Sequence, residues 1–215
     1  MEFWVKVLIA YLLGSVVGSL VVGFLKGGVD IRKSGSGNAG ATNALRTQGA
    51  AFAVWVMIID VVKGWFAAAV LPTLPLPGIP PASDDLWLLL PAACAFAAIL
   101  GHVFPVWHGF RGGKGVATLV GAYAGLGPFL LVPLFATWLA IVVVSGFVGF
   151  ASIVAALAMP VYLLLRHGPV FTYELGFSLA CAALVFYTHR GNVRRMREGT
   201  EPRSRKLWLF GRGRA

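Results

Sequence analysis

Residues Val116–Ser145 read VATLVGAYAGLGPFLLVPLFATWLAIVVVS and contain no charged side chain. A transmembrane helix needs about 20 apolar residues, so this run is too long for one ordinary span. The pentapeptide GLGPF at Gly125–Phe129 interrupts it. Pro128 suits the first turn of a new helix, where its missing N–H would have no intrahelical partner. The sequence therefore predicts two helices, over 116–126 and 128–145; a simple kink would instead leave one span fewer.

The rest of the chain has the same apolar character. Of the 215 residues, 58% are hydrophobic and 12% are charged, and the mean hydropathy is +0.81. Soluble domains have about 25% charged residues. We therefore predict an all-α, polytopic integral membrane helix bundle that forms a single domain over residues 1–215. About seven transmembrane helices are expected, over residues 3–25, 51–71, 86–104, 116–126, 128–145, 149–166 and 170–188.

Lysine and arginine residues are unevenly distributed between the expected spans. With seven spans and the N-terminus outside, 15 of the 18 bases fall in the inner segments. The outer connection PTLPLPGIPPASDD, Pro72–Asp85, has no base and two acids. Because bases are retained on the cytoplasmic side, this distribution predicts an outside N-terminus and a cytoplasmic C-terminus.

Several classes of function are disfavoured by composition. The formal net charge of +10 does not indicate nucleic acid, because the bases lie between or after the spans with few aromatic residues among them. Such bases usually contact anionic lipid head groups. The two cysteines, Cys94 and Cys181, lie inside apolar runs and are interpreted as buried hydrophobic residues. No spacing typical of metal ligands is present, so neither a metal nor another cofactor is expected. The C-terminal tail carries further bases suited to membrane lipids, namely Arg203, Arg205, Lys206, Arg212 and Arg214.

One polar segment stands out between the first two spans. RKSGSGNAGATNALR, Arg32–Arg46, is rich in Gly, Ser, Asn and Thr and has a base at each end. Glycines let successive backbone N–H groups turn toward one point, and the polar side chains add further donors. Composition alone also fits a flexible linker.

A second segment, GHVFPVWHGFRGGKGVAT at Gly101–Thr118, places four glycines around Arg111 and Lys114 just before an expected helix. Backbone amides, a helix N-terminus and a lysine together are suited to binding phosphate. The segment is not a Walker A loop, because Gly115 stands where that motif has Ser or Thr. The alternative interpretation is a short turn with orienting bases.

Histidine is the usual side chain for proton transfer near neutral pH, and the chain has four. None of the four is followed by Asp in the His-x4-Asp arrangement of one large acyltransferase class. His189 begins the basic segment HRGNVRRMREGTE, His189–Glu201.

Within the second span, Asp60 and Lys63 are three residues apart and can offset each other on one helical face. That pair fits a packing role at least as well as a functional one.

These segments, in this order, resemble a known family. GSGNAGATNALR, GHVFPVWHGFRGGKGVAT and HRGNVRRMREGTE are similar to the three cytoplasmic motifs of the bacterial acyl-phosphate-dependent glycerol-3-phosphate acyltransferase (PlsY) family. DVVKG, Asp60–Gly64, also resembles a family pattern. The resemblance covers essentially the whole chain. One departure lies at SGFVGFAS, which retains only Ser145 and Ser152 where the family tends to have several small hydroxyl residues.

The resemblance implies an enzyme of the bacterial cytoplasmic (inner) membrane whose active site faces the cytoplasm. It would transfer a fatty acyl group from acyl phosphate to the 1-hydroxyl of sn-glycerol 3-phosphate, giving lysophosphatidate and phosphate. The three segments, 32–46, 101–118 and 189–201, would supply the site. The expected catalytic residues are Ser36, Lys114, His189 and Asn192. The expected substrate-binding residues are Gly35, Gly37, Asn38, Thr42, Asn43, Arg46, Gly112, Gly113, Gly115 and Arg195.

Two routes for the proton of the glycerol hydroxyl are consistent with the sequence. Acyl phosphate is already activated, so positioning and donors aimed at developing oxyanion charge can supply much of the rate. Ser36 has no base in its own segment and is therefore expected to act as a hydrogen-bond donor. The proton of the glycerol hydroxyl passes either to His189 or to a phosphate oxygen of the donor, with the second slightly favoured.

Two other classes of protein compete with an enzyme. A membrane transporter or exchanger of phosphorylated metabolites could use the same bases and glycines. Transporters often have internal repeats and place their site near the bilayer midplane, whereas no repeat is visible here and the polar segments lie between spans. A purely structural bundle would not explain the density of Gly, Ser and Asn.

Overall fold

The computed structural model describes residues 1–204 and 207–211, and every regular element in these ranges is a helix. The predicted all-α class is therefore confirmed. Part of the predicted basic tail, Arg205, Lys206, Arg212 and Arg214, lies outside the described residues. Both cysteines, Cys94 and Cys181, are buried free thiols, as expected from the apolar runs around them.

The chain packs as two compact units that divide between Pro128 and Phe129. This point lies in the GLGPF pentapeptide. Helix α6 (Val116–Leu126) ends just before it, and Pro128 opens a short 3-10 turn, η5 (Pro128–Leu130), that leads into α7 (Leu131–Ser145). The predicted break, with proline at the start of the new helical segment, is confirmed.

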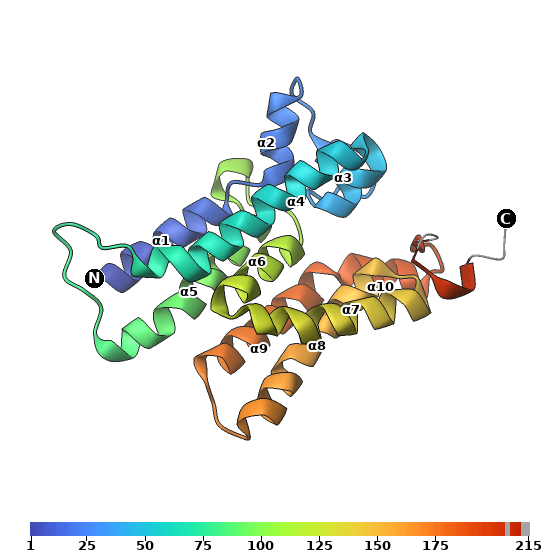
Figure 1. The fold of residues 1–215 in the computed structure, drawn as a ribbon. Helices are drawn as coiled ribbons and strands as arrows, with labels where there is room; N and C mark the ends of the chain where they lie inside the picture. Colours follow the sequence, from blue (N-terminus) through green and yellow to red (C-terminus); the bar gives the residue numbers. More distant parts are fainter. Residues whose placement is uncertain (205–206, 212–215) are drawn as a thin grey trace. The chain divides into compact units, whose positions relative to one another are not determined.

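The first unit contains six α-helices and several short turns of helix, seen in Figure 1 from blue to yellow-green. In this unit the π-helical segment η2 (Phe66–Val70) and the 3-10 turn η3 (Leu71–Thr73) continue α4 (Ala50–Trp65) without a break. The three elements form one long helical segment over Ala50–Thr73. In chain order the elements of the first unit are α1 (Glu2–Gly14), α2 (Gly18–Leu25), η1 (Ile31–Lys33), α3 (Ala41–Gln48), α4 (Ala50–Trp65), η2 (Phe66–Val70), η3 (Leu71–Thr73), α5 (Asp84–Val103), η4 (Val106–His108) and α6.

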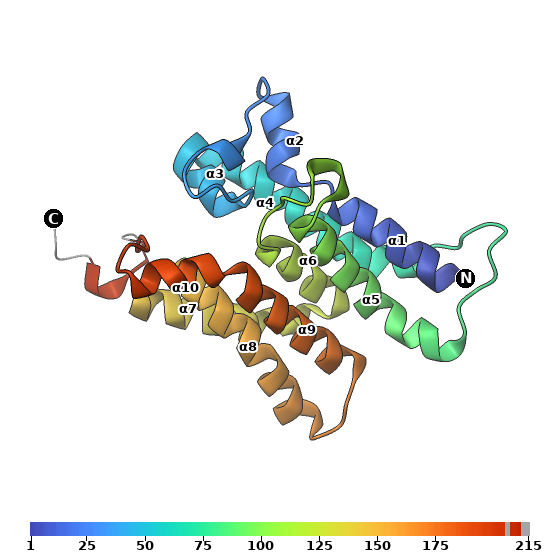
Figure 2. The same cartoon turned by 180° about the vertical axis from the view of Figure 1, so that it is seen from behind.

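Glycines allow the long helices of this unit to approach closely. Helix α1 packs on α5 and α4 packs on α6, as the reverse view in Figure 2 also shows. A Cβ at Gly14 would overlap the backbone of Ala98, and one at Gly121 would overlap the carbonyl of Val61. The small residues of GSVVG at Gly14–Gly18 and of GAYAG at Gly121–Gly125 therefore serve helix–helix contact.

The two ends of the first unit differ in character. At one end, near the N-terminus, the proline-rich connection between η3 and α5 folds over the start of α1 (Figure 1). There Lys6 pairs with Glu2 at 2.7 Å and donates to the carbonyl of Pro72, while the amide of Ala82 donates to Glu2. At the other end lie α2 and α3, which carry the first glycine-rich segment between them. A buried cluster around Ile31, Ala44 and Val56 joins this segment to α4.

The second unit consists of α7, α8 (Val148–His167), α9 (Tyr173–Thr188), α10 (Arg190–Arg197) and the short turn η6 (Leu209–Gly211). Helix α8 packs between α7 and α9. The chain after α10 returns to the α7–α8 turn, where the amide of Ser204 donates to the carbonyl of Gly146. The guanidinium of Arg203 lies over the rings of Phe147 and Trp208, at 4.7 and 4.2 Å from their centroids.

Each of the seven predicted apolar segments is helical, but the helices differ in length. Four are long and apolar enough to cross a membrane: Ala50–Thr73, Asp84–His108, Pro128–Ser145 and Val148–His167. The first predicted span, 3–25, is a pair of helices bent by 47° at residues 15–17, which makes a fifth span if counted as one. Helices α6 and α9 are apolar but shorter; the 11 residues of α6 extend only about 16 Å. The molecule is thus an all-helical membrane protein with four or five candidate spans among the described residues.

Candidate active site

The first glycine-rich segment is built around the side chain of Asn43, which is 1% exposed. Its Nδ2 group donates to the carbonyls of Ile31, Ser34 and Asn38 at 3.0–3.1 Å. Its Oδ1 atom accepts from the amide of Ser36 at 2.9 Å. Asn43 was predicted to bind substrate, but its polar atoms hold the loop itself, so its contribution is to the position of the loop.

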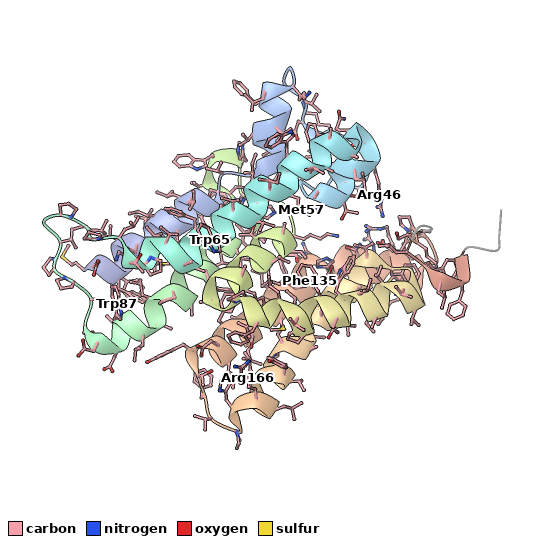
Figure 3. The ribbon with its side chains drawn as sticks, viewed as in Figure 1. Arg46, Met57, Trp65, Trp87, Phe135 and Arg166 are labelled. Atoms are coloured by element: carbon pink, nitrogen blue, oxygen red, sulfur yellow. The ribbon has the colours of Figure 1, made fainter. Side chains whose placement is uncertain are left out.

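Glycine is required where this loop turns. Gly35 and Gly37 have φ angles of +59° and +70°, in the left-handed region that glycine adopts without strain. A Cβ at Gly35 would also overlap Oδ1 of Asn43. The side chains of Ser36, Thr42 and Arg46 are exposed around this frame, with Arg46 in the last turn of α3 (Figure 3). The loop therefore presents a hydroxyl pair and a guanidinium from a rigid support.

Arg32 connects the first segment to the second. Its guanidinium pairs with Asp30 at 2.9 Å and donates through Nη1 to the carbonyls of His108 at 3.3 Å and Arg111 at 2.9 Å. The hydrogen bonds from Arg32 hold the pKa of the Asp30 carboxyl below its ordinary value, and the same pairing raises the pKa of Arg32. Both groups stay charged at neutral pH, so the connection is a charge-assisted one.

The second segment folds back on the end of α5. The amide of Gly112 donates to the carbonyl of Val103, and that of Gly113 donates to the carbonyl of His102. A Cβ at either glycine would overlap His102, at its carbonyl or its ring. Gly115, with φ +82°, is the N-cap of α6. Lys114 therefore sits, partly buried, in the turn that opens α6, where helix N-termini favour anions.

Beneath this segment lies a buried polar cluster that the sequence revealed only in part. The predicted pair of Asp60 and Lys63 is confirmed at 2.9 Å. His102, from α5, joins it: its Nδ1 atom lies 2.9 Å from Lys63 Nζ and 3.2 Å from Asp60 Oδ1. No local spacing could have found this contact, because His102 comes from another helix.

The third segment belongs to the second unit and begins with His189. This residue is buried, and its Nδ1 atom lies 2.8 Å from the carbonyl oxygen of Val185. A carbonyl oxygen can only accept, so Nδ1 carries the proton. In the neutral ring Nε2 is then the acceptor. This tautomer has the lone pair that a general base at His189 requires.

Glu201 organises the rest of the third segment. Its Oε1 atom accepts from Asn192 Nδ2 at 2.6 Å, and its Oε2 atom accepts from Arg195 Nε at 2.7 Å. Glu201 was not selected from the sequence, although it lies in the segment; it is brought back to α10 by a turn in which its amide donates to the carbonyl of Arg195. Asn192 and Arg195, both predicted site residues, are thus fixed by one carboxylate.

The structure brings the first two segments together within the first unit. The backbone amide of Ser36 donates to Oδ1 of Asn43, and the expected role of its hydroxyl as a donor stays a prediction. Amides, hydroxyls and cations gather on glycine-supported loops there, while the third segment forms its own network in the second unit. Such an all-helical, apolar chain is a polytopic membrane protein, and its first unit presents two linked glycine-rich, basic loops.

Comparison with known proteins identifies the family. The family model for glycerol-3-phosphate acyltransferase matches residues 4–199. The glycerol-3-phosphate acyltransferase of Thioalkalivibrio sulfidiphilus is 42% identical over 92% of this chain and 91% of its own, and that of Bordetella pertussis is 40% identical over 92% and 89%. The chain belongs to the glycerol-3-phosphate acyltransferase family.

Solved structures agree with this assignment. The crystal structure of PlsY, an integral membrane glycerol 3-phosphate acyltransferase, in its glycerol 3-phosphate form is 34% identical, with a TM-score of 0.80 over 94% of this chain and 96% of its own. The lysophosphatidic acid form of PlsY gives a TM-score of 0.79 at the same identity, over 94% and 95%. The expected resemblance to the PlsY family is confirmed.

Proposed function

We propose that this enzyme transfers a fatty acyl group from acyl phosphate to the 1-hydroxyl of sn-glycerol 3-phosphate, giving lysophosphatidate and inorganic phosphate. Family membership supports the acceptor and the product, since the related PlsY structures are described as glycerol 3-phosphate and lysophosphatidic acid forms. The observation that carries the proposal is the Arg32 connection, which holds two amide-rich, basic loops side by side. Both substrates have a phosphate, and such loops suit phosphate.

The chemistry needs no covalent intermediate on the protein. The O1 atom of glycerol 3-phosphate attacks the acyl carbonyl carbon, and a C–O bond forms to give a tetrahedral oxyanion. The bond between that carbon and the bridging oxygen of the phosphate then breaks, and phosphate leaves with the electron pair. The proton of the glycerol hydroxyl passes to Nε2 of His189 or, as we favour, to a phosphate oxygen of the donor. Positioning and oxyanion stabilisation supply the rate.

Most of the predicted residues have a place in this scheme. Ser36 donates through its hydroxyl to a phosphate or carbonyl oxygen from a loop that Asn43 holds in shape. Lys114 and Arg46 attract the phosphates as cations. The amides of Gly35 and Gly115 add donors, whereas Gly37, Gly112 and Gly113 shape the loops, because their amides donate to the carbonyls of Ser34, Val103 and His102. His189 and Asn192 keep the roles expected from the sequence, and Arg195 supports Asn192 through Glu201.

We place the enzyme in the bacterial cytoplasmic (inner) membrane, with its N-terminus outside and the three segments facing the cytoplasm. The charge distribution of 15 inner bases out of 18 supports this orientation. Single cysteines at the exposed positions Ser34 and Ser83 test it. An impermeant maleimide should label position 34 only from the cytoplasmic side and position 83 only from the outside. Labelling of position 34 from the outside would contradict the proposal.

The experiment that tests the reaction uses purified protein in detergent with labelled acyl phosphate and glycerol 3-phosphate. Lysophosphatidate should form with no sealed compartment present, and inorganic phosphate should be released in equal amount. Acyl carrier protein and coenzyme A thioesters, offered separately, test the choice of donor. Uptake of glycerol 3-phosphate into proteoliposomes without product would instead support the transporter alternative.

A further inference from the structure

Three ionisable side chains are buried in the first unit with no role in the proposed reaction. Asp60, Lys63 and His102 are 1%, 4% and 2% exposed. They come from α4 and α5, and their polar atoms lie within 3.2 Å of one another. Charges buried in this way cost free energy that a matched apolar core would not, unless further hydrogen bonds satisfy them. Their surroundings should therefore show what they hold in place.

Lys63 and Asp60 hold the break between α1 and α2. Lys63 Nζ donates to the carbonyls of Gly14 and Val16 at 2.9 and 2.8 Å. Asp60 Oδ1 accepts from the amide of Gly18 at 3.0 Å. The last carbonyls of one helix and the first amides of the next have no intrahelical partner, so an ammonium and a carboxylate supply the partners on each side of the 47° bend.

His102 extends this pair toward the second glycine-rich segment. The ammonium of Lys63 can only donate, and its close partners are the carbonyls of Gly14 and Val16, the carboxylate of Asp60 and Nδ1 of His102. His102 Nδ1 therefore lies within hydrogen-bond distance of both charged groups, 2.9 Å from Lys63 Nζ and 3.2 Å from Asp60 Oδ1. The opposite nitrogen, Nε2, then faces Gly113, because a Cβ at Gly113 would overlap it.

A second contact joins the same two residues through the backbone. The carbonyl of His102 accepts from the amide of Gly113 at 3.1 Å. Gly113 is thus held by His102 at its amide and packed against the imidazole at its Cα. Lys114 is the next residue, so the direction in which the chain leaves Gly113 sets where its ammonium can reach.

We propose that Asp60, Lys63 and His102 form a positioning triad that supports the Gly113–Lys114 turn and fixes it relative to the α1–α2 break. The triad does not touch the reacting atoms; it acts through the backbone that carries Lys114. This inference rests on the proposed phosphate-binding role of Lys114. The proposal explains why the cluster is charged although it is buried. Hydrogen bonds between charged groups hold their partners in a defined geometry, and apolar contacts define the geometry of their partners less strictly.

A double-mutant cycle tests the contact between the imidazole and the loop. In Gly113→Ala the new methyl group meets the His102 ring, which displaces the loop and should lower kcat/KM by about 10-fold or more. Asn at position 102 keeps an amide where Nδ1 was but has no atoms in place of Nε2 and Cε1. The double variant His102→Asn/Gly113→Ala should therefore recover several-fold of the activity lost in Gly113→Ala. Purely additive losses would overturn the proposal.

Two matched controls separate this positioning role from general destabilisation. Lys6 on α1 is, like Lys63, a buried cation, and it pairs with Glu2 far from the loop. Lys6→Gln combined with Gly113→Ala should give multiplied, independent losses. Gly109→Ala places a methyl group that meets nothing within 4 Å, although φ is +62° there, so it should cost much less than Gly113→Ala. Equal losses at Gly109 and Gly113 would contradict the contact even if His102→Asn failed to fold.

A readout that does not depend on catalysis keeps this proposal apart from the proposed function. A single cysteine at the exposed position Arg111 reports the loop through its rate of reaction with maleimide. His102→Asn should change this rate several-fold while the thermal midpoint changes little. If the rate changes but Lys114→Ala retains full activity, the triad stands and the role of Lys114 falls. An unchanged rate would overturn the triad.

Discussion

Arg32 donates through Nη1 to the main-chain carbonyl of Arg111 at 2.9 Å. The contact joins two segments that are 79 residues apart in the sequence. The guanidinium of Arg32 contacts the main chain of Arg111, so the two positively charged side chains are not paired with each other. Asp30 holds the same guanidinium from the opposite side through Nε and Nη2. The relative position of the two glycine-rich segments therefore depends on one arginine whose planar fork contacts three partners.

Replacement of Arg32 should weaken substrate binding more than it weakens the fold. Lysine keeps the charge but cannot pair with Asp30 and reach the carbonyls of His108 and Arg111 together, because it lacks the planar fork. We expect Arg32→Lys to lower kcat/KM by about 10-fold, as for one charge-assisted hydrogen bond. Steady-state kinetics with both substrates measure this. Lys33→Ala, an exposed neighbour, should stay near the wild type; an equal loss there would contradict the connection.

The ion pair of Asp30 and Arg32 should make stability depend on pH in the acid range. Because the folded pKa of Asp30 lies below its unfolded value, the pair stabilises the protein above about pH 4. That contribution is lost as the pH falls through the folded pKa. Thermal unfolding in detergent should therefore show the wild type losing its advantage over Asp30→Asn on acidification. Arg32→Gln should remove the same pH-dependent difference; a difference that persisted without Arg32 would contradict this cause.

Two cations of the glycine-rich segments should matter far more than a base elsewhere on the surface. Lys114→Ala and Arg46→Ala should each lower kcat/KM by about 10-fold to 100-fold or more, because each removes a charge-assisted contact to phosphate. Lys26→Ala is the matched control, an exposed base at the end of α2, and it should change turnover little. Equal losses at Lys26 and Lys114 would remove the reason for placing the site at these loops.

The carboxylate of Glu201 should prove necessary for a stable second unit. Glu201→Ala leaves the Asn192 amide and the Arg195 guanidinium without their acceptor, which should cost about 1–3 kcal/mol of unfolding free energy. Denaturant unfolding measures this loss. Glu198→Ala is a matched control, because its carboxylate is exposed and lies 3.8 Å from Arg194; we expect a change within about 0.5 kcal/mol. Similar losses at both positions would contradict a special role for Glu201.

The features that the sequence predicted well are those with a local physical signal. The seven predicted apolar runs are helical, although only four or five candidate spans result, GLGPF located the break, and the spacing of Asp60 and Lys63 indicated an ion pair on one helical face. These signals come from residues close together in the chain, where helical periodicity relates sequence to geometry directly.

The features that were missed depend on contacts distant in sequence. His102 meets Lys63 from another helix, 39 residues away, and no periodicity links them. Glu201 reaches Asn192 only because the chain turns back after α10. Asn43 was expected to bind substrate because polar residues in glycine-rich loops often do, yet its amide is fully used by the loop. Composition can indicate a binding segment, but only the fold shows which polar groups are already engaged.

The identity of the base is the sharpest question that the His189 geometry makes testable. Because Nδ1 donates to the carbonyl of Val185, the two amide substitutions separate the two ring nitrogens. Asn at position 189 can keep the Nδ1 bond but removes Nε2, whereas Gln can place an amide near Nε2 but has no basic lone pair. If a phosphate oxygen of the donor takes the proton, His189→Gln should retain measurable kcat and His189→Asn should lose more.

The pH profile of kcat at saturating glycerol 3-phosphate decides between the two bases. Saturation is needed because kcat then reports the bound complex rather than lost affinity. With the phosphate oxygen as base, the wild type and His189→Gln should have the same pH profile of kcat. Neither profile should then contain a limb that is due to His189, near the ordinary histidine pKa of about 6.5. With His189 as base, that limb should be present in the wild type, and His189→Gln should lose about 10²–10⁴-fold in kcat. A loss of that size together with loss of the limb would make His189 the catalyst and exclude the substrate-assisted route.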